Sequence, residues 1–186
     1  MLFPGAVLPL HIFEPRYRQL VQEGRDFGVV LIREGQEVGR VPRVHDVGTL
    51  AHPERVEALP DGRFDIVAKG VRRFRIAALR EPDPYLLADI EWLEDRPGAS
   101  SPRLLALLED YLALHGLAVA PQLSPDLGKR AVWLVGAVFQ AEPGKRQALL
   151  ETGDPGLAER LLAEEVDRLR RLGTLTPIPP PGFSPN

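Results

Sequence analysis

Residues 2–18 read LFPGAVLPLHIFEPRYR, and this stretch combines closely spaced apolar side chains with three prolines. A proline nitrogen cannot donate to a β-ladder, so prolines in extended chain are confined to sheet edges and irregular segments. Pro4, Pro9 and Pro15 therefore predict that residues 2–13 form an irregular edge segment whose apolar side chains alternate inward and outward. An unpaired apolar edge is adhesive, which makes this segment a candidate surface for an extended peptide.

The candidate binding residues are the apolar side chains of this segment and the two side chains that open the next one. They are Leu2, Phe3, Leu8, Leu10, Ile12, Phe13, Arg16 and Tyr17. A second interpretation stays open, in which the apolar members are ordinary core and the charged side chains around Pro15 pair to fix the start of a helix. The residues alone assign no chemistry to Arg16 and Tyr17.

Residues 1–97 alternate short β-like runs with turn signals. The clearest hairpin places Pro60, Asp61 and Gly62 between two apolar runs, where proline favours an early corner and glycine tolerates a positive φ. One helix is expected from Pro15 to Gly24. About six strands curled into one sheet are predicted. The strand candidates are residues 27–32, 47–51, 56–59, 64–67, 70–76 and 85–92.

The second part of the chain is predicted to be helical. Residues 103–173 carry apolar side chains at helical spacing in about four segments, several of which open with proline. Residues 98–102 are expected to be a linker, and the proline-rich residues 174–186 a flexible tail. The predicted class is therefore α+β, with a β domain over residues 1–97 followed by a small helical lobe.

Composition places the chain among ordinary globular proteins: 44% of its residues are hydrophobic, 26% are charged, and the formal net charge is −3. Such a balance gives no bulk electrostatic attraction for nucleic acid or an anionic membrane. The lack of cysteine excludes disulfides, thiolate metal sites and cysteine nucleophiles. No stretch approaches the roughly 18 apolar residues that a membrane span needs. We therefore expect a cytoplasmic protein without a membrane partner.

Motifs of common enzyme chemistry are missing from the sequence. There is neither a G-x-x-x-x-G-K-[ST] phosphate loop nor a G-x-G-x-x-G dinucleotide loop, and no serine lies in a G-x-S-x-G elbow. His45, Asp46 and His52 are the one combination considered for a metal site; because their spacing is irregular, we interpret them as loop and strand-end side chains. We predict no catalytic residue, no cofactor and no metal.

One local basic cluster supports an alternative function. Its members are Lys69, Arg72, Arg73 and Arg75. With Phe74 among them, the cluster suits contact with an RNA backbone combined with base stacking. Against this, strand alternation places Phe74 opposite Arg73 and Arg75, which predicts a core position, and Asp65 on the preceding strand can neutralise an arginine across the sheet. RNA binding through Arg72–Arg75 is the alternative, and nucleic acid is the less favoured partner.

The segment at residues 2–18 closely resembles the signature of the Lon protease N-terminal (substrate-binding) domain family. The resemblance covers nearly all of residues 1–172. It continues through FGVVL at 27–31, VGTLA at 47–51, LPDGRFDI at 59–66, residues 70–76, DPYL at 83–86, LSP at 123–125 and KRQALLE at 145–151.

The resemblance implies a PUA-like β pseudo-barrel followed by a small helical lobe. In Lon this module precedes ATPase and protease domains and helps to capture unfolded or tagged polypeptides. The missing phosphate loop predicts a free-standing, ATP-independent and non-catalytic member. Its expected partners are unfolded or extended polypeptides and a separate protease or chaperone. A homodimer paired edge to edge is also considered, since an exposed strand can pair with its own copy.

Overall fold

The computed structural model describes residues 1–34, 43–80, 85–94, 101–117 and 125–172 of the 186-residue chain. These residues divide into two compact units, a β unit up to Glu94 and a helical unit from Ser101 onward. The predicted domain limits near residues 97 and 173 and the predicted tail lie outside the described residues. Each unit is considered by itself below.

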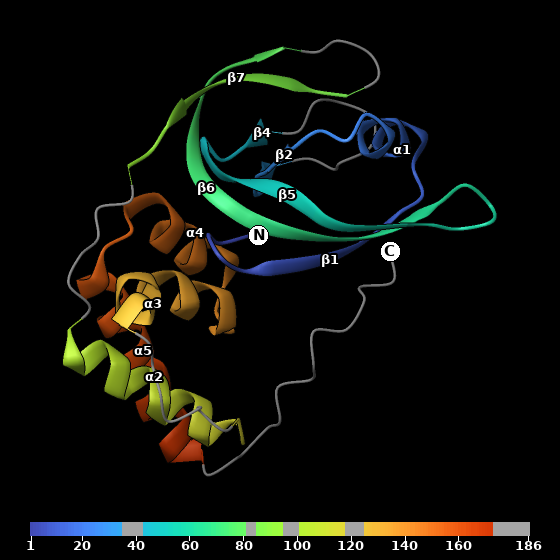
Figure 1. Ribbon diagram of the computed structural model, residues 1–186. Coiled ribbons are helices and arrows are strands. Elements are labelled where there is room, and N and C mark those ends of the chain that lie inside the picture. Colours follow the sequence, from blue (N-terminus) through green and yellow to red (C-terminus); the bar gives the residue numbers. More distant parts are fainter. Residues whose placement is uncertain (35–42, 81–84, 95–100, 118–124, 173–186) are drawn as a thin grey trace. The chain divides into compact units, whose positions relative to one another are not determined.

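Within the described residues, the β unit contains seven strands and one helix. In chain order they are β1 (Val7–Ile12), α1 (Pro15–Gln22), β2 (Phe27–Val29), β3 (Ile32–Glu34), β4 (Arg43–Val44), β5 (Val47–Ala58), β6 (Phe64–Arg80) and β7 (Leu87–Trp92). Five strands form one antiparallel sheet in the order β1-β6-β5-β2, with β7 also paired to β6, while β3 and β4 form a separate pair. Strand β6 is curved and pairs with three strands of this sheet, β1, β5 and β7 (Figure 1).

The α+β class is confirmed, but the pseudo-barrel is not closed. β1 and β2 end the pairing order of the large sheet, and the described residues contain no ladder between them. Closure would need such a ladder, whereas β2 has three residues and pairs with β5. Register shifts in β5 and β6 mark the irregular positions of this sheet, and bulges of this kind bend strands. The β unit is therefore a curled, open sheet.

The hairpin predicted around Pro60 is confirmed as the β5–β6 connection. The Leu59 N–H donates to the Arg63 carbonyl at 2.8 Å, and the Gly62 N–H donates to the Leu59 carbonyl at 2.9 Å. Gly62 has a φ of 81°, which side chains other than glycine rarely adopt. Asp61 accepts hydrogen bonds from the backbone and the side chain of Arg63, which closes the turn from outside.

The prediction that residues 2–13 are irregular throughout is wrong for β1. This strand pairs with β6 in a continuous antiparallel register, from Val7 opposite Lys69 to Ile12 opposite Phe64. Pro9 is tolerated within it because β1 is the outermost strand of the sheet, so only one of its two edges needs donors.

The residues before β1 are anchored in the core. Leu2 is 2% exposed and Phe3 1% exposed. The Thr49 hydroxyl donates to the Leu2 carbonyl at 2.8 Å, and the Gly5 N–H donates to the Gly70 carbonyl at 2.7 Å. These bonds satisfy backbone groups that burial would otherwise leave without partners. The anchored segment fixes the point at which β1 enters the sheet.

Phe74 lies in the core, as strand alternation predicts. Gly48 faces it across the β5–β6 ladder, and Gly28 lies on the neighbouring strand β2. A Cβ atom on Gly28 would lie 2.8 Å from the Phe74 ring, and one on Gly48 would lie 2.9 Å from it. Two glycines therefore make the space that this ring fills.

The helical unit contains four helices within the described residues, as predicted. They are α2 (Pro102–Leu114), α3 (Pro125–Val138), α4 (Pro143–Thr152) and α5 (Pro155–Leu172). Each begins with proline, whose missing N–H costs nothing in a first turn. Ser101 caps α2 by accepting from the Leu104 N–H at 3.0 Å. None of the described helices is long and apolar enough to cross a membrane.

The end of α1 is tied to the segment before β7 by one carboxylate. Glu23 accepts a hydrogen bond from the Tyr85 hydroxyl at 2.7 Å and another from the Gln19 amide at 3.1 Å. These bonds, the first of them most, hold the pKa of Glu23 below its usual value, and the same contact raises the pKa of Tyr85. The stability contributed by the Glu23 carboxylate is present above its unfolded-state pKa and is lost as the pH falls through the lowered folded-state pKa.

We therefore expect Tyr85→Phe to raise the pKa of Glu23 toward its ordinary value. The substitution removes the hydroxyl donor and keeps the ring. Carboxyl chemical shifts followed by NMR during an acid titration report this pKa directly. Gln19→Ala, which removes the weaker donor, should raise it less. An equal or larger shift in Gln19→Ala would contradict the order of the two contributions.

Candidate functional site

The outermost position of β1 gives this strand one edge that pairs with β6 and one that does not. Residues of an antiparallel pair alternate between those that exchange hydrogen bonds with the partner and those that direct their backbone groups away from it. The Gly70 N–H donates to the Ala6 carbonyl at 2.9 Å, which fixes the phase of this alternation. Even-numbered residues of β1 therefore face β6, whereas Val7, Pro9 and His11 direct their backbone groups outward.

We call the backbone groups of Val7, Pro9 and His11 the outer edge of β1. It offers three carbonyl acceptors but only two N–H donors, because Pro9 has none. Among the described residues, no backbone hydrogen bond outside the ladders involves these three residues. Two exposed apolar side chains flank the edge: Val7 is 55% exposed and Phe13 46% exposed. Such an edge can add an extended chain as one more strand.

The two faces of β1 differ in polarity. Leu8 packs against the core cluster of Leu2, Ala51 and Ala68, and alternation places the half-buried Leu10 and Ile12 on the same face. The side chains of Val7, Pro9 and His11 occupy the other face. A strand added at the outer edge would therefore meet apolar side chains on the first face and mixed ones on the second.

The His11 side chain is held by hydrogen bonds on both ring nitrogens. Its Nδ1 lies 2.6 Å from Asp65 Oδ1, and Arg63 Nη1 lies 3.1 Å from its Nε2. Because a guanidinium only donates, Nε2 accepts from Arg63, and this assigns the proton to Nδ1, which donates to Asp65. The His11 ring also stacks on Phe13, with centroids 6.3 Å apart. This cluster fixes the last residues of β1.

The partner of Asp65 corrects the sequence prediction. We expected its carboxylate to neutralise an arginine across the sheet, whereas it bonds to His11 on β1. The pairing of β1 with β6 places these two residues directly opposite each other. Arg63 instead forms its ion pair with Asp61, 2.6 Å away within the same turn.

The predicted binding residues fall into three groups in the structure. Leu2 and Phe3 are buried in the core, so in this conformation their side chains are not accessible to a ligand. The half-buried ones are Leu8, Leu10, Ile12, Arg16 and Tyr17, and Phe13 is exposed. Val7 was missed, although it lies in the same alternating run. The role of these residues in binding stays a prediction.

Arg16 and Tyr17 interact at the start of α1. Arg16 Nε donates to Glu14 Oε2 at 2.9 Å, as the second interpretation of this segment predicts. The Arg16 guanidinium also lies over the Tyr17 ring, 4.5 Å from its centroid. These contacts fix the entry into α1, immediately after the exposed Phe13.

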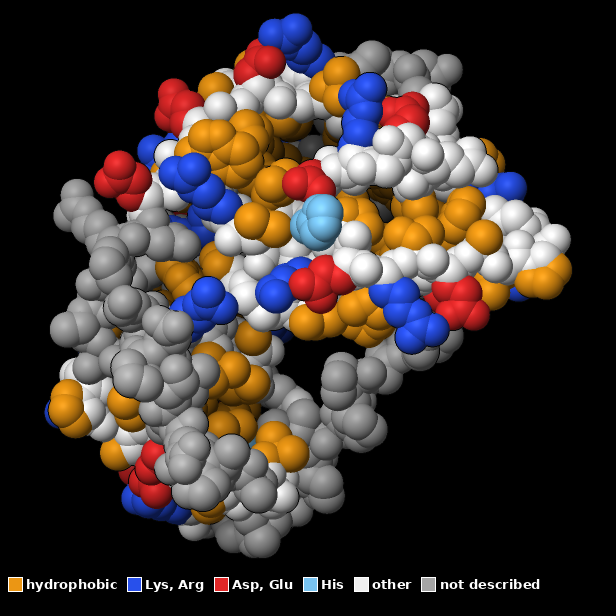
Figure 2. Space-filling model, in the orientation of Figure 1, with side chains coloured by type: hydrophobic (Ala, Val, Ile, Leu, Met, Phe, Trp, Pro, Cys, Tyr) orange, Lys and Arg blue, Asp and Glu red, His pale blue; other side chains and the backbone are white. Residues whose placement is uncertain are grey.

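The basic cluster considered for RNA is divided among different surroundings. Arg73 is 4% exposed, and its Nη2 donates to the Glu94 carbonyl at 3.2 Å. Arg72 lies over the Trp92 ring, 5.1 Å from the centroid, while Arg75 is exposed. Figure 2 shows acidic and basic side chains interspersed on the visible face of the β unit. The arginines therefore do not converge on one surface.

Of the histidines considered for a metal, His52 pairs with a carboxylate through its side chain, and His45 is bonded through its backbone. His52 Nδ1 lies 2.7 Å from Asp26 Oδ1, and the backbone N–H of His45 donates to the Leu31 carbonyl at 2.8 Å. Within the described part of the chain, no three His, Asp or Glu side chains are grouped closely enough to hold a metal ion.

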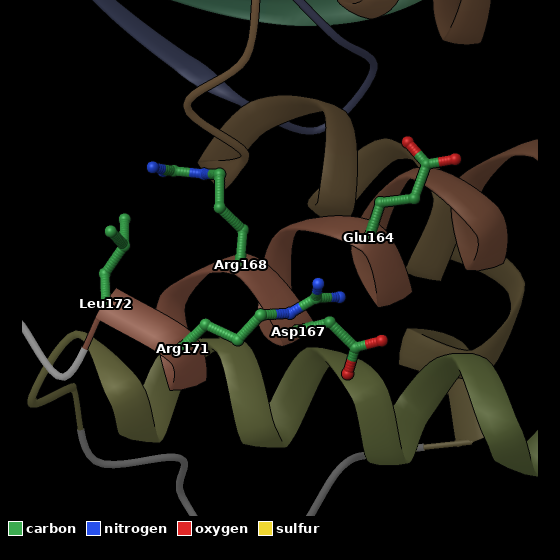
Figure 3. Close-up of a pocket in the computed structure, with 5 residues that line it drawn as sticks. All are labelled: Glu164, Asp167, Arg168, Arg171 and Leu172. Carbon is green, nitrogen blue, oxygen red and sulfur yellow. The ribbon is translucent and has the colours of Figure 1, made fainter.

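A surface depression of about 480 Å³ lies along α5 in the helical unit. It is lined by Glu164, Asp167, Arg168, Arg171 and Leu172, all from α5 (Figure 3). Arg168 donates to Glu165 at 2.8 Å and lowers the pKa of that carboxyl group. Ligand sites bring polar groups together from separate elements inside an apolar cleft, whereas these side chains cover one face of a single helix. We do not assign a function to this depression.

Comparison with known proteins identifies the family. A family model described as the ATP-dependent protease La (LON) substrate-binding domain matches residues 1–166. The Lon protease of Flavobacterium johnsoniae is 30% identical over 134 residues, which cover 68% of this chain and 16% of that protein. Lon protease 2 of Myxococcus xanthus is 27% identical over 192 residues, which cover 92% of this chain and 23% of that protein. The chain thus spans less than a quarter of either protease.

Solved structures agree with this assignment. The crystal structure of a Lon N-terminal domain protein from Xanthomonas campestris matches with a TM-score of 0.66 and 30% identity, covering 88% of this chain and 92% of that one. The N-terminal domain of a Mycobacterium avium complex Lon protease matches with a TM-score of 0.54 at 17% identity, which supports the fold alone. These matches concern the N-terminal, substrate-binding part of Lon and not its ATPase or protease domains. The chain belongs to the Lon substrate-binding domain family.

Proposed function

We propose that this protein is a non-catalytic module that captures unfolded or extended polypeptide segments at the outer edge of β1. The observation that carries the proposal is the phase of the β1–β6 ladder, which directs five backbone hydrogen-bonding groups away from the sheet. Membership of a substrate-binding family supports a protein as the ligand. The proposal includes a cytoplasmic location and the transfer of captured segments to a separate protease or chaperone.

The chemistry of the edge favours loose selectivity. Backbone hydrogen bonds do not depend on the sequence of the bound segment, so any chain that can extend is able to form them. The exposed side chains of Val7 and Phe13 add a preference for apolar segments, which folded proteins bury and unfolded ones expose. The edge is therefore suited to recognising the unfolded state rather than one sequence.

Only weak binding is expected at this edge. Five hydrogen bonds of about 1 kcal/mol each contribute about 5 kcal/mol, from which the cost of ordering a flexible segment is subtracted. Burial of apolar side chains offsets part of that cost. The net free energy is then below about 5 kcal/mol, so we expect a dissociation constant of about 0.2 mM or weaker for a single segment. Rapid release follows from such an affinity and suits a protein that passes its ligands on.

Charged substitutions at the exposed apolar positions test the proposal. We expect Val7→Lys and Phe13→Lys each to weaken binding of a permanently unfolded, fluorescently labelled polypeptide at least about 5-fold in anisotropy titrations, because each places a desolvated charge beside the added strand. Both side chains are exposed, so the fold should tolerate the change. Titrations at two salt concentrations should give similar affinities for the wild-type protein.

Leu79→Lys is the matched control, because Leu79 is 39% exposed and lies in the part of β6 that pairs with β7, away from β1. It should bind the polypeptide like the wild-type protein. Equal weakening in all three variants would place the contact elsewhere. A structured RNA titrated in parallel tests the alternative function. An affinity for RNA that falls as the salt concentration rises, together with no binding of the unfolded polypeptide, would reject polypeptide capture.

A further inference from the structure

Pro9 occupies the centre of the outer edge of β1 and removes one donor there. Its neighbours along that edge, Val7 and His11, keep their N–H groups. The edge therefore has an N–H donor at its first and third positions, none at the second, and a carbonyl acceptor at all three. We propose that Pro9 is a specificity-determining residue that suppresses pairing of β1 with β1 of a second copy while it leaves the edge open to a foreign strand. This inference rests on the proposed function.

Self-pairing would be symmetric about Pro9. When two β1 strands meet antiparallel about a two-fold axis, the register that brings most outward groups together places Val7 opposite His11 of the second copy. Those two pairs exchange four hydrogen bonds. The central pair is Pro9 opposite Pro9, which has two acceptors and no donor. A residue with an N–H at this position would provide six bonds, so Pro9 removes two of six.

Shifting the register does not recover the lost bonds. A slip of two residues in either direction places Pro9 opposite Val7 or opposite His11 of the second copy. Each such pair forms one bond from the N–H of the other residue to the Pro9 carbonyl, which gives two bonds per dimer. A slip of one residue would bring outward groups opposite inward ones. The four-bond register is therefore the best that two copies of β1 can reach.

A foreign strand loses less than a second copy does. An ordinary residue opposite Pro9 still donates its N–H to the Pro9 carbonyl, so five of six bonds form. One proline thus removes one bond from a foreign strand but two from a self-pair, and it leaves two carbonyl oxygens opposed in the self-pair. Backbone hydrogen bonding alone therefore favours a foreign strand over a second copy of β1.

The side chains of β1 show why this discrimination is needed. In the symmetric register, Leu8 would lie directly opposite Leu10 of the second copy, at a pair where side chains approach closely. Both leucines are half-buried in the β unit, and Val7 is exposed. Such apolar cross-strand pairs favour association of edge strands, and a proline on the edge opposes it. Pro9 therefore acts against the edge-to-edge homodimer considered from the sequence.

The oligomeric state of Pro9→Val tests the inference, since valine restores the N–H and favours β structure. In sedimentation velocity, the full chain carrying Pro9→Val should dimerise with a dissociation constant at least about 10-fold below that of the wild-type protein. Circular dichroism establishes whether the variant is folded. A folded variant that stays as monomeric as the wild-type protein would overturn the inference.

A peptide pair decides the question if Pro9→Val does not fold. Two peptides of residues 6–13 with the same solubilising tail, one of wild-type sequence and one carrying Pro9→Val, are titrated against the wild-type protein. The Pro9→Val peptide offers five bonds against four, so it should bind at least about 5-fold more tightly, and equal affinities would overturn the inference. Failure of the proposed function is distinguishable: the unfolded polypeptide would not bind the wild-type protein, whereas the folded Pro9→Val variant would still dimerise or, if it does not fold, the Pro9→Val peptide would still bind more tightly than the wild-type peptide.

Discussion

Gly70→Ala is expected to destabilise the β unit by about 3 kcal/mol or more, at the upper end of what overpacking costs. A Cβ atom on Gly70 would lie 2.2 Å from the Phe3 carbonyl oxygen and 2.9 Å from its carbonyl carbon. Both atoms belong to the backbone, so no side-chain rotation relieves the overlap. The chain must move either β6 or the anchored N-terminal segment.

The segment that would move is the one that positions β1. Gly70 accepts a hydrogen bond from Gly5 and donates one to Ala6, and Leu2 fills the core above it. Displacing Phe3 would therefore break two backbone bonds and expose two buried apolar side chains. Because those bonds also set the phase of the β1–β6 ladder, Gly70→Ala should weaken polypeptide binding in addition to lowering stability.

Urea unfolding measures this effect, and the two tryptophans separate the units. Trp92 lies in β7 and Trp133 in α3, so backgrounds that keep only one of them, Trp133→Phe or Trp92→Phe, report the β unit or the helical unit by fluorescence. Gly144→Ala is the control, since Gly144 lies in the first turn of α4 and nothing lies within 4 Å of the added Cβ, so no overpacking is expected. If the Trp92 transition of Gly70→Ala coincided with that of the wild-type protein, the close approach of Phe3 would not constrain the fold.

The elements that could be predicted from the sequence are those with local signals. Prolines at helix starts and apolar side chains at helical spacing indicate four helices, and the turn at residues 60–62 indicates a hairpin. Both predictions rest on interactions between residues fewer than about 15 positions apart. The structure confirms them because these short-range preferences agree with the packing of each unit.

Long-range pairing could not be predicted in the same way. β1 pairs with β6, and the register of His11 opposite Asp65 joins residues 54 positions apart. Nothing in either segment specifies the other, so the prolines of residues 2–13 predict an irregular segment where β1 forms, and the sequence predicts an arginine partner for Asp65 where the structure has His11. The open end of the sheet is missed for the same reason, because closure depends on whether β1 and β2 meet.

The candidate site, like the fold, could be predicted from the sequence only in part. The apolar pattern of residues 2–13 identifies the segment that contains the outer edge of β1, but the pattern alone does not tell inward from outward positions. Leu2 and Phe3 are buried because Gly70, far along the chain, allows the backbone to approach. The missing N–H of Pro9 favours an unpaired edge at that residue, but the direction of the Val7 and His11 backbone groups follows only from the phase of the β1–β6 ladder.

Tyr111→Ala is expected to destabilise the helical unit by about 3–5 kcal/mol, as truncation of a large buried aromatic side chain does. Tyr111 is fully buried, and its ring lies 4.6 Å from the His115 ring and 6.0 Å from the Phe139 ring. Its hydroxyl accepts a hydrogen bond from the Gln140 N–H at 3.2 Å. Tyr111→Phe keeps the ring and removes that acceptor, so it should cost only about 0.5–2 kcal/mol.

The pH dependence of the helical unit separates the hydroxyl from the ring. Burial raises the pKa of Tyr111, because the phenolate is poorly solvated in the core. The folded state therefore resists ionisation, and stability falls as the pH rises above the unfolded-state pKa of about 10. Tyr111 is the one tyrosine of residues 101–172, so Trp133 fluorescence in urea at pH 7 and pH 11 should show a loss of stability that Tyr111→Phe largely removes. An equal loss in Tyr111→Phe would assign the alkaline transition to other groups and reject the buried hydroxyl as its cause.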